Sequence, residues 1–114
     1  MMKSLKPQTK VISKGNRSVF METYETTVID QSFYKTNGEE LLIVKNTDHC
    51  DIILDSMKNL KLTIKTLTNC KISPDVNKID EEWDEIELNK GACVTFQFVE
   101  DIWYILSSDG IKLE

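Results

Sequence analysis

Apolar and polar residues alternate along much of the chain with the two-residue period of a β-strand. Between positions 60 and 67, apolar side chains occupy 60, 62 and 64, with lysine and threonine between them, and the alternation returns at 94–98. Successive side chains of a strand point to opposite faces, so this pattern predicts strands with one buried and one wet side. Runs of β-branched and aromatic residues predict further strands at 17–24, 28–34 and 52–54.

Two stretches, 41–44 and 102–106, are apolar without interruption. Such runs suit strands that are covered on both faces, by a core or by a neighbouring subunit. A sheet protein of 114 residues cannot easily cover both runs by itself. The sequence therefore predicts self-association.

Turn signals separate the expected strands, and no convincing internal repeat is found. The pair Asn37-Gly38 can supply the positive φ angles of a tight hairpin. Short strands with turns about every eight to twelve residues predict an all-β fold, which we expect to be a small antiparallel β-sandwich or barrel-like module.

The segment 79–88 fits two interpretations. Ile79, Trp83 and Ile86 have the spacing of one face of a helix, whereas Ile86 and Leu88 alternate with acidic residues as in a strand. The flanking β segments favour a loop followed by a short strand.

Composition indicates one folded domain, because 40% of the residues are hydrophobic and only 29% are charged. The longest apolar run is far below the ~20 residues that cross a bilayer. The first residues have no apolar core of a secretory signal. We expect neither a membrane partner nor secretion.

The net charge of −5 is unevenly distributed, because a basic leader precedes an acidic body. The first 21 residues contain no acid, and the remaining 93 carry nine basic and nineteen acidic side chains. We predict a basic N-terminal arm at 1–16 and a β-rich domain at 17–114. The arm is interpreted either as a solvated terminus or as a segment that docks on an acidic protein partner. Nucleic acid is disfavoured, because no aromatic residues interleave with the charges and the acidic body would repel a polyanion. The candidate partner-binding residues are Lys3, Lys6, Lys10, Lys14 and Arg17.

The three cysteines, Cys50, Cys70 and Cys93, form no C-x-x-C pair, and His49 is the single histidine. This is neither a disulfide framework nor a zinc site. We expect buried free thiols in a reducing cytosol. His49 and Cys50 are adjacent, so on a strand they would point to opposite faces and could not form a catalytic dyad.

Six carboxylates in the eight residues 80–87 are the sharpest local feature. The cluster lacks the glycine turn of a calcium loop, which favours a solvated acidic loop or a patch that meets a basic partner. No nucleotide, phosphate or zinc-hydrolase motif is present. Trp103 and Tyr104 could stack on a sugar or base, but their apolar neighbours favour core or interface packing. We predict no catalytic, metal or cofactor site and no enzymatic activity.

The order of these segments between positions 41 and 110 resembles small β-rich modules of bacteriophage virion proteins, including head fibres, capsid decoration proteins and tail fibre segments. The landmarks are Val44-Lys45-Asn46, Ile72, Ile79-Asp80, Leu88, Asn89-Lys90-Gly91, Val94-Thr95-Phe96 and Trp103-Tyr104-Ile105-Leu106-Ser107-Ser108. Two positions depart from the pattern. Glu81 stands where glycine often follows Ile-Asp, and Val99-Glu100-Asp101-Ile102 replaces a glycine-bearing hairpin. A cellular β-sandwich stays open as an alternative.

The resemblance implies a structural, non-enzymatic virion part that is made in the host cytoplasm and located in the virion. The first hypothesis is an auxiliary capsid (decoration) or head fibre component, whose leader binds capsid or other virion proteins and whose copies form a homo-oligomer, often a trimer in such proteins. The alternative is a tail-associated receptor- or carbohydrate-binding β module, with Trp83, Trp103 and Tyr104 as its candidate platform. An enzyme is the third reading and would require His49 within hydrogen-bond reach of a cysteine in a pocket.

Overall fold

Strands and turns make up the whole described part of the chain. The computed structural model describes residues 3–5, 8–14, 17–23 and 25–113, and side chains between 25 and 111. No helix occurs in these residues, and the predicted all-β class is confirmed. The strands are β1 (Lys3–Leu5), β2 (Gln8–Lys14), β3 (Arg17–Thr23), β4 (Thr26–Ile29), β5 (Phe33–Lys35), β6 (Leu41–Val44), β7 (His49–Leu54), β8 (Lys61–Thr66), β9 (Asn69–Pro74), β10 (Ile86–Val99) and β11 (Ile102–Leu113).

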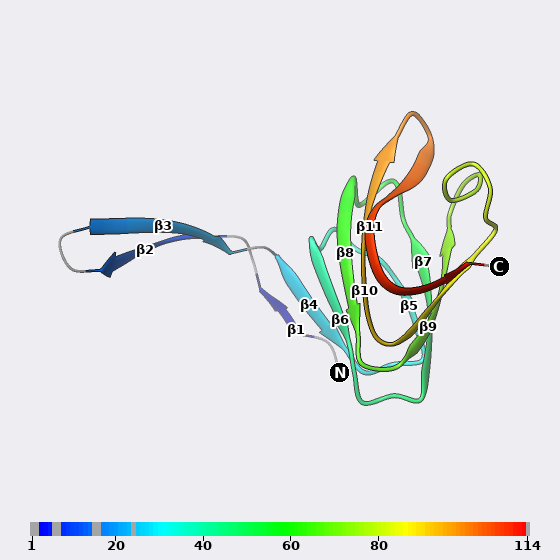
Figure 1. Cartoon of the computed structure of the whole chain (residues 1–114), viewed down its shortest axis with the longest axis horizontal. Coiled ribbons are helices and arrows are strands. Elements are labelled where there is room, and N and C mark those ends of the chain that lie inside the picture. The colour runs from blue at the N-terminus through cyan, green and yellow to red at the C-terminus, as the bar shows by residue number, and fades with distance from the viewer. Residues whose placement is uncertain (1–2, 6–7, 15–16, 24, 114) are drawn as a thin grey trace.

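From β4 to β9 the chain winds as a flat coil, in which each turn contributes one strand to each of two half-sheets. β4, β6 and β8 pair in parallel, with Thr26, Leu41 and Thr63 in register. β5, β7 and β9 also pair in parallel. Figure 1 shows the first half-sheet on the left of the curled body and the second on its right. The coil thus stacks three turns, although their sequences do not repeat.

β10 joins the two half-sheets into one nine-stranded sheet. Its first residues run antiparallel to β9, with Ile86 opposite Ile72, and its later residues run antiparallel to β8, with Val94 opposite Ile64. β11 pairs along β10, and β1 pairs antiparallel with β4 at the far edge. The sheet curls into half a barrel (Figure 1).

The expected antiparallel arrangement is wrong for β4 to β9, whose mutual pairings are parallel. Of the pair Asn37-Gly38, Gly38 has the predicted positive φ, at 95°, whereas Asn37 does not have a positive φ. However, the Asn37-Gly38 turn carries the chain from one half-sheet to the other, so it closes no hairpin between β5 and β6. The expected strand 28–34 is two strands, β4 and β5, separated by a bend at 30–32. The two-sheet sandwich is not confirmed, because β4 to β11 belong to one continuous sheet.

The core fills the concave side of the curled sheet. Leu62 and Ile64 of β8 point inward and are fully buried, as their alternation predicted. Leu60 breaks that prediction, since it lies before β8 and is 69% exposed. Trp103 is fully buried and meets the edge of Phe96 at a ring-centroid distance of 6.4 Å. Burying aromatic and branched side chains of this size stabilises the fold by roughly 1.5–3 kcal/mol each.

The segment 79–88 is a loop followed by a strand, as expected. Ile79 and Trp83 form an isolated bridge, and β10 begins at Ile86. Ile79 and Ile86 are buried, whereas Glu87 lies on the outer side. Alternation within a strand therefore accounts for Ile86 and Leu88, and helical spacing does not.

β2 and β3 form a hairpin that pairs only with itself among the described strands. In Figure 1 the hairpin stands away from the curled sheet. The predicted strand at 17–24 corresponds to β3. The basic arm and the division into 1–16 and 17–114 stay predictions, because no side chain before residue 25 is described.

Candidate functional site

The outer surface of the first half-sheet has an unusual composition for this acidic protein. Its outward positions alternate with buried ones on β4, β6, β8 and the second part of β10, and none of them is Asp or Glu. We call these ten strand positions the carboxylate-free face, although exposed Glu40 directly precedes β6 and exposed Asp109 of β11 lies opposite Cys93. It consists of Thr26, Val28, Leu41, Ile43, Lys61, Thr63, Lys65, Cys93, Thr95 and Gln97.

The outer surface of the second half-sheet carries charges of both signs, and we call it the mixed-charge face. It consists of Phe33, Lys35, His49, Asp51, Ile53, Asn69, Lys71, Ser73 and Glu87. His49 Nε2 lies 2.6 Å from Asp51 Oδ1, and both side chains are about half exposed. Two open depressions, of about 430 and 270 Å³, flank this pair.

An open depression of about 590 Å³ lies on the carboxylate-free face. Thr63 and Thr95 line it, and their hydroxyl oxygens share a hydrogen bond of 2.9 Å. Leu41 and Leu106 add apolar surface, and Leu106 is 53% exposed. Glu40 and Lys61 line the same depression, as does Ser107. Hydroxyls, apolar side chains and one charge of each sign suit contact with another surface.

His49 and Cys50 lie on opposite faces of β7, as predicted. His49 is on the mixed-charge face, whereas Cys50 is fully buried in the core. Cys70 is buried beside Cys50 on the next strand, and its Sγ lies 3.1 Å from Thr66 Oγ1. His49 and Cys70 nevertheless both line the open depression of about 270 Å³. The His49 ring is hydrogen-bonded to Asp51 Oδ1, at 2.6 Å.

The expected burial of the cysteines is confirmed for two of the three. A hydrogen bond with the Cys70 thiol, together with burial, raises the pKa of Cys50 far above its usual range. Cys93 is only partly buried, because it points outward from β10 on the carboxylate-free face. All three are free thiols.

The acidic segment 80–87 is an exposed loop that leads into β10. Glu81, Glu82 and Asp84 are exposed. Asp80 instead attaches the loop to β11: its backbone N–H donates to the Trp103 carbonyl at 2.9 Å, and its Oδ1 accepts from the Ile105 N–H at 2.9 Å. Among the described side chains, no group of three His, Cys, Asp or Glu residues could hold a metal ion.

The three candidate platform aromatics do not share one surface. Trp103 is fully buried, which confirms the core-packing interpretation for this residue. Trp83 is half-buried and packs against the core. Tyr104 follows Trp103 and lies on the outer side of β11. A stacking surface on the carboxylate-free side would therefore depend on Tyr104 alone among these three.

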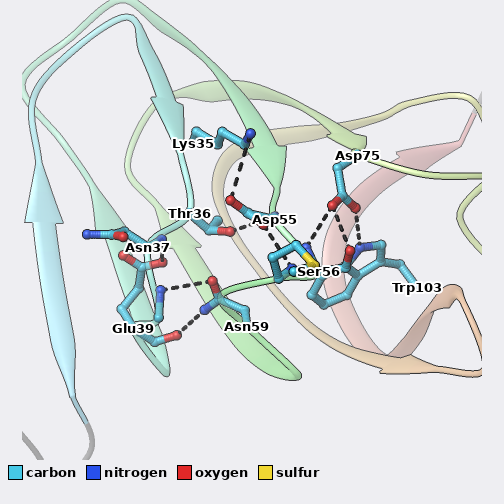
Figure 2. A network of polar contacts seen from close by, with 11 residues as sticks. Lys35, Thr36, Asn37, Glu39, Asp55, Ser56, Asn59, Asp75 and Trp103 are labelled. Atoms are coloured by element: carbon cyan, nitrogen blue, oxygen red, sulfur yellow. Dashed lines mark hydrogen bonds and ion pairs between the residues drawn. The ribbon is translucent and has the colours of Figure 1, made fainter.

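A ladder of hydrogen bonds connects the turns of the coil, and sequence reasoning missed it (Figure 2). Thr36, Asp55 and Asp75 directly follow β5, β7 and β9. The Asp55 N–H donates to Thr36 Oγ1 at 2.8 Å. The N–H and hydroxyl of Ser56 donate to Asp75 Oδ2 at 2.9 and 2.7 Å, and Trp103 Nε1 donates to Asp75 Oδ1 at 3.2 Å. The ladder holds successive turns in register.

Glu39 fixes the first of these turns from inside the protein. It is only 1% exposed and accepts hydrogen bonds from the Tyr34 hydroxyl at 2.5 Å and the Asn37 N–H at 2.9 Å. Its backbone carbonyl accepts from Asn59 Nδ2 at 2.6 Å, which links it to the next turn. Burial and the bond to Glu39 raise the pKa of Tyr34, so the hydroxyl stays protonated and continues to donate. This carboxylate has a structural role.

The five candidate partner-binding residues belong to the N-terminal segment. Lys3, Lys10, Lys14 and Arg17 lie in β1, β2 and β3, and Lys6 is outside the described residues. Their side chains are not described, so attachment through them stays a prediction.

Comparison with known proteins assigns no family. No protein family, curated protein or solved structure matches the chain. In the described part of the chain, no helix is long and apolar enough to cross a membrane. The resemblance to virion modules accordingly rests on the sequence landmarks alone.

Proposed function

We propose that this chain is a non-enzymatic structural protein of a bacteriophage virion, either an auxiliary capsid (decoration) protein or a head fibre component attached to the shell. The observation that supports the proposal is that the interior of the described fold is packed, while its surface depressions are open. The concave side of the sheet is filled by Trp103, Phe96 and the aliphatic core, and the depressions of the outer faces are open. Reaction sites need convergent groups in a concave, water-excluding pocket, whereas this body offers broad surfaces.

The polar ladder supports a mechanical role. It connects three successive turns and ends on the buried indole of Trp103, so the coil is tied along its stacking direction. Hydrogen bonds to a charged acceptor such as Asp75 contribute roughly 1.5–3 kcal/mol each. A body braced in this way keeps its shape when it is attached to a shell.

The basic leader is the proposed attachment segment. Lys3, Lys6, Lys10, Lys14 and Arg17 would meet an acidic or mixed surface of the capsid protein or of another virion protein. The acidic body favours orientation with the leader toward such a surface. Free cysteines agree with synthesis in the host cytoplasm before assembly in the virion.

Self-association belongs to the same proposal, with a homotrimer as the form that the resemblance implies. The run 41–44 motivated this expectation. Leu42 and Val44 are covered by the core, but Leu41 and Ile43 lie on the outer side of β6 and are only partly buried. A second copy or a shell protein would complete their burial.

A tail-associated receptor- or carbohydrate-binding module is the second candidate. The depression of about 590 Å³ with the hydroxyls of Thr63 and Thr95 favours it. The burial of Trp103 counts against it, because sugar-binding surfaces depend on exposed aromatic rings.

Particle composition tests the proposed function. Particles are purified from the strain that carries the coding sequence, and the chain is quantified by mass spectrometry relative to the major capsid protein. We expect a fixed ratio across preparations. A chain that is expressed but absent from purified particles would overturn the proposal.

A variant whose leader carries no basic side chains tests whether the leader attaches the chain to the particle. Replacing the five basic leader residues by glutamine should lower the particle-bound amount at least tenfold. The matched control replaces five exposed body lysines by glutamine and should leave that amount unchanged; these are Lys35, Lys45, Lys58, Lys78 and Lys90. Equal losses in both variants would mean that overall charge, and not the leader, governs attachment. Binding of the purified chain to glycans, abolished by Thr63→Glu, would favour the second candidate.

A further inference from the structure

Two thiols lie side by side on neighbouring parallel strands inside the curled sheet. Cys50 of β7 and Cys70 of β9 are directly opposite each other in the register, and both side chains are buried. Opposite residues of neighbouring strands lie about 4.8 Å apart, which is within the roughly 4.4–6.8 Å that separates the Cα atoms of a disulfide. A bond between these two sulfurs would therefore need little movement of the backbone.

The two thiols are already hydrogen-bonded, and their roles in this bond differ. The Cys50 thiol donates to the Cys70 sulfur, which raises the pKa of Cys50 and lowers the pKa of Cys70. The Thr66 hydroxyl and the positive charge that His49 can carry also lower the pKa of Cys70, against the effect of burial. Cys70 is therefore the thiol that ionises first, while Cys50 keeps its proton. A thiolate is the nucleophilic form of cysteine.

The Thr66 hydroxyl is the third polar group of this cluster. It is fully buried, and its Oγ1 lies 3.1 Å from Cys70 Sγ. The same oxygen accepts from the Thr68 N–H at 3.1 Å and lies 2.6 Å from the Thr68 carbonyl oxygen. The hydroxyl has one proton, which it can donate either to this carbonyl or to a Cys70 thiolate. A negative charge on the Cys70 sulfur would thus have two donors, Thr66 and Cys50.

Cys70 also lies beside open surface, although its side chain is only 1% exposed. The pairing of β9 with β10 ends at Cys70 and Leu88, and β10 next pairs with β8 from Cys93 onward. Cys70 is one of the residues that line the open depression of about 270 Å³, and His49 is another. A small oxidant can approach Cys70 from this side, whereas Cys50 is fully buried.

We infer that Cys50 and Cys70 form a redox-active dithiol, which a peroxide converts into a disulfide between β7 and β9. Cys70 is the thiol that reacts with the peroxide, and Cys50 is the thiol that completes the disulfide. The bond would join the second and third turns of the coil on the core side. The inference goes beyond the proposed function, because it concerns the chemistry of the core and applies to the chain with or without a virion.

The reaction is balanced with hydrogen peroxide as the oxidant. The Cys70 thiolate attacks one peroxide oxygen, the O–O bond breaks, and the hydroxide that leaves takes up the proton lost by Cys70, which gives a sulfenic acid and water. The Cys50 sulfur then attacks the Cys70 sulfur, the S–O bond breaks, and the hydroxide leaves with the Cys50 proton as a second water. The two thiols lose two electrons, and one peroxide gains them.

Peptide mapping of the unsubstituted full chain is the first test. The folded chain is treated with excess hydrogen peroxide, its remaining thiols are blocked with N-ethylmaleimide in urea, and it is digested with trypsin without reduction. Lys58, Lys61 and Lys65 lie between the two cysteines, so a Cys50–Cys70 disulfide joins two tryptic peptides. Mass spectrometry should detect this linked pair from a monomeric chain. Recovery of both cysteines as blocked thiols, or of Cys70 linked to Cys93, would overturn the inference.

The rate of linkage in the unfolded chain shows whether the fold brings the two thiols together. The same peroxide treatment is applied to the chain in concentrated urea, and the linked pair is quantified over time in both samples. We expect the disulfide to form several-fold faster in the folded chain, because the register holds Cys50 opposite Cys70. Formation that is equally fast or faster in urea would contradict the inference.

A matched pair of variants tests the effect of the disulfide on stability. Cys93→Ser removes the partly exposed thiol, and the control carries Cys50→Ala in addition. Peroxide should raise the melting temperature of the first variant by roughly 10 °C, because the disulfide closes a loop of about 20 residues, and dithiothreitol should reverse the rise. The control should show no rise, and an equal rise in both variants would contradict the disulfide as its cause. The peptide mapping needs no substitution, so the inference stays testable if the control does not fold. None of these outcomes depends on particle composition.

Discussion

We expect removal of the Asp75 side chain to lower the free energy of unfolding by more than the small size of this side chain suggests. Its carboxylate accepts hydrogen bonds from Ser56 of the preceding turn and from the buried indole of Trp103. Asp75→Ala removes the acceptor from three donors at once. The Ser56 groups are only half-buried and can turn to water, whereas Trp103 is fully buried and has no access to it.

The expected loss follows from this difference. A buried donor left without a partner costs about 1–3 kcal/mol, and the two bonds from Ser56 add about 1 kcal/mol once water replaces the carboxylate. We expect Asp75→Ala to lower the free energy of unfolding by about 3 kcal/mol. A chain of 114 residues has an unfolding entropy near 0.24 kcal/mol/K, so the melting temperature should fall by about 12 °C.

Urea denaturation followed by tryptophan fluorescence measures this loss. Asp84→Ala is the matched control, because Asp84 is also an acidic loop residue but its side chain is 85% exposed and lies 3.8 Å from Lys78. The control should lose less than about 0.5 kcal/mol. A loss in Asp75→Ala no larger than that of the control would refute the role of the ladder.

The pH dependence gives a second readout of the same carboxylate. Burial alone would raise the pKa of Asp75, but the hydrogen bonds from Ser56 and Trp103 outweigh burial and lower it. With the folded pKa below the unfolded value of about 3.9, the stabilisation is complete above that value and is lost as the pH falls through the folded pKa. The stability difference between wild type and Asp75→Asn should therefore be constant near pH 7 and narrow below about pH 4. A difference that stays constant down to pH 2 would contradict this account.

Three further outcomes are expected. Gly110→Ala would place a Cβ 2.9 Å from the Ala92 Cβ at a φ of 82°, and it should lower the free energy of unfolding by about 2–4 kcal/mol. Gly91 has a φ of 91° but open space around it, so Gly91→Ala should lower that free energy by only about 1–2 kcal/mol. Urea denaturation measures both losses. Asp101→Gly relieves a φ of 67° in the β10–β11 turn and should raise the melting temperature by several degrees, which calorimetry can measure. The fully buried Trp103 should fluoresce in the blue and resist acrylamide, and complete quenching of all tryptophan emission would contradict the core.

The local pattern of apolar and polar residues was enough to predict most strands. The run 41–44 is β6, and the alternation between 60 and 67 falls on β8 apart from Leu60. The parallel pairing could not be predicted, because it depends on residues that are distant in the sequence. Thr26, Leu41 and Thr63 are in register but are separated by turns of unequal length, so the structural repeat leaves no sequence repeat. Asn37-Gly38 has the sequence of a hairpin turn, but only Gly38 has a positive φ in the structure, and the pair forms a corner between the half-sheets.

The polar ladder could not be predicted from the sequence, for a related reason. The sequence does not distinguish Thr36, Asp55 and Asp75 from other polar residues until the ends of β5, β7 and β9 are known. Only then does each prove to follow the last residue of a strand. Glu81 and Asp101 were visible as departures from a glycine pattern, and both have positive φ, at 61° and 67°. The departures therefore marked positions where the backbone favours glycine, although the chain does without it.

The outward residues of β6 show how far the pattern of apolar and polar residues could predict burial. In β6 the pattern Leu41-Leu42-Ile43-Val44 predicted coverage on both faces, and the structure supplies a core for Leu42 and Val44 only. The outward residues of the neighbouring strand β8 are polar or basic, namely Lys61, Thr63 and Lys65. Leu41 and Ile43 therefore stay only partly buried on the outer side of β6, where covering them would remove apolar surface from water.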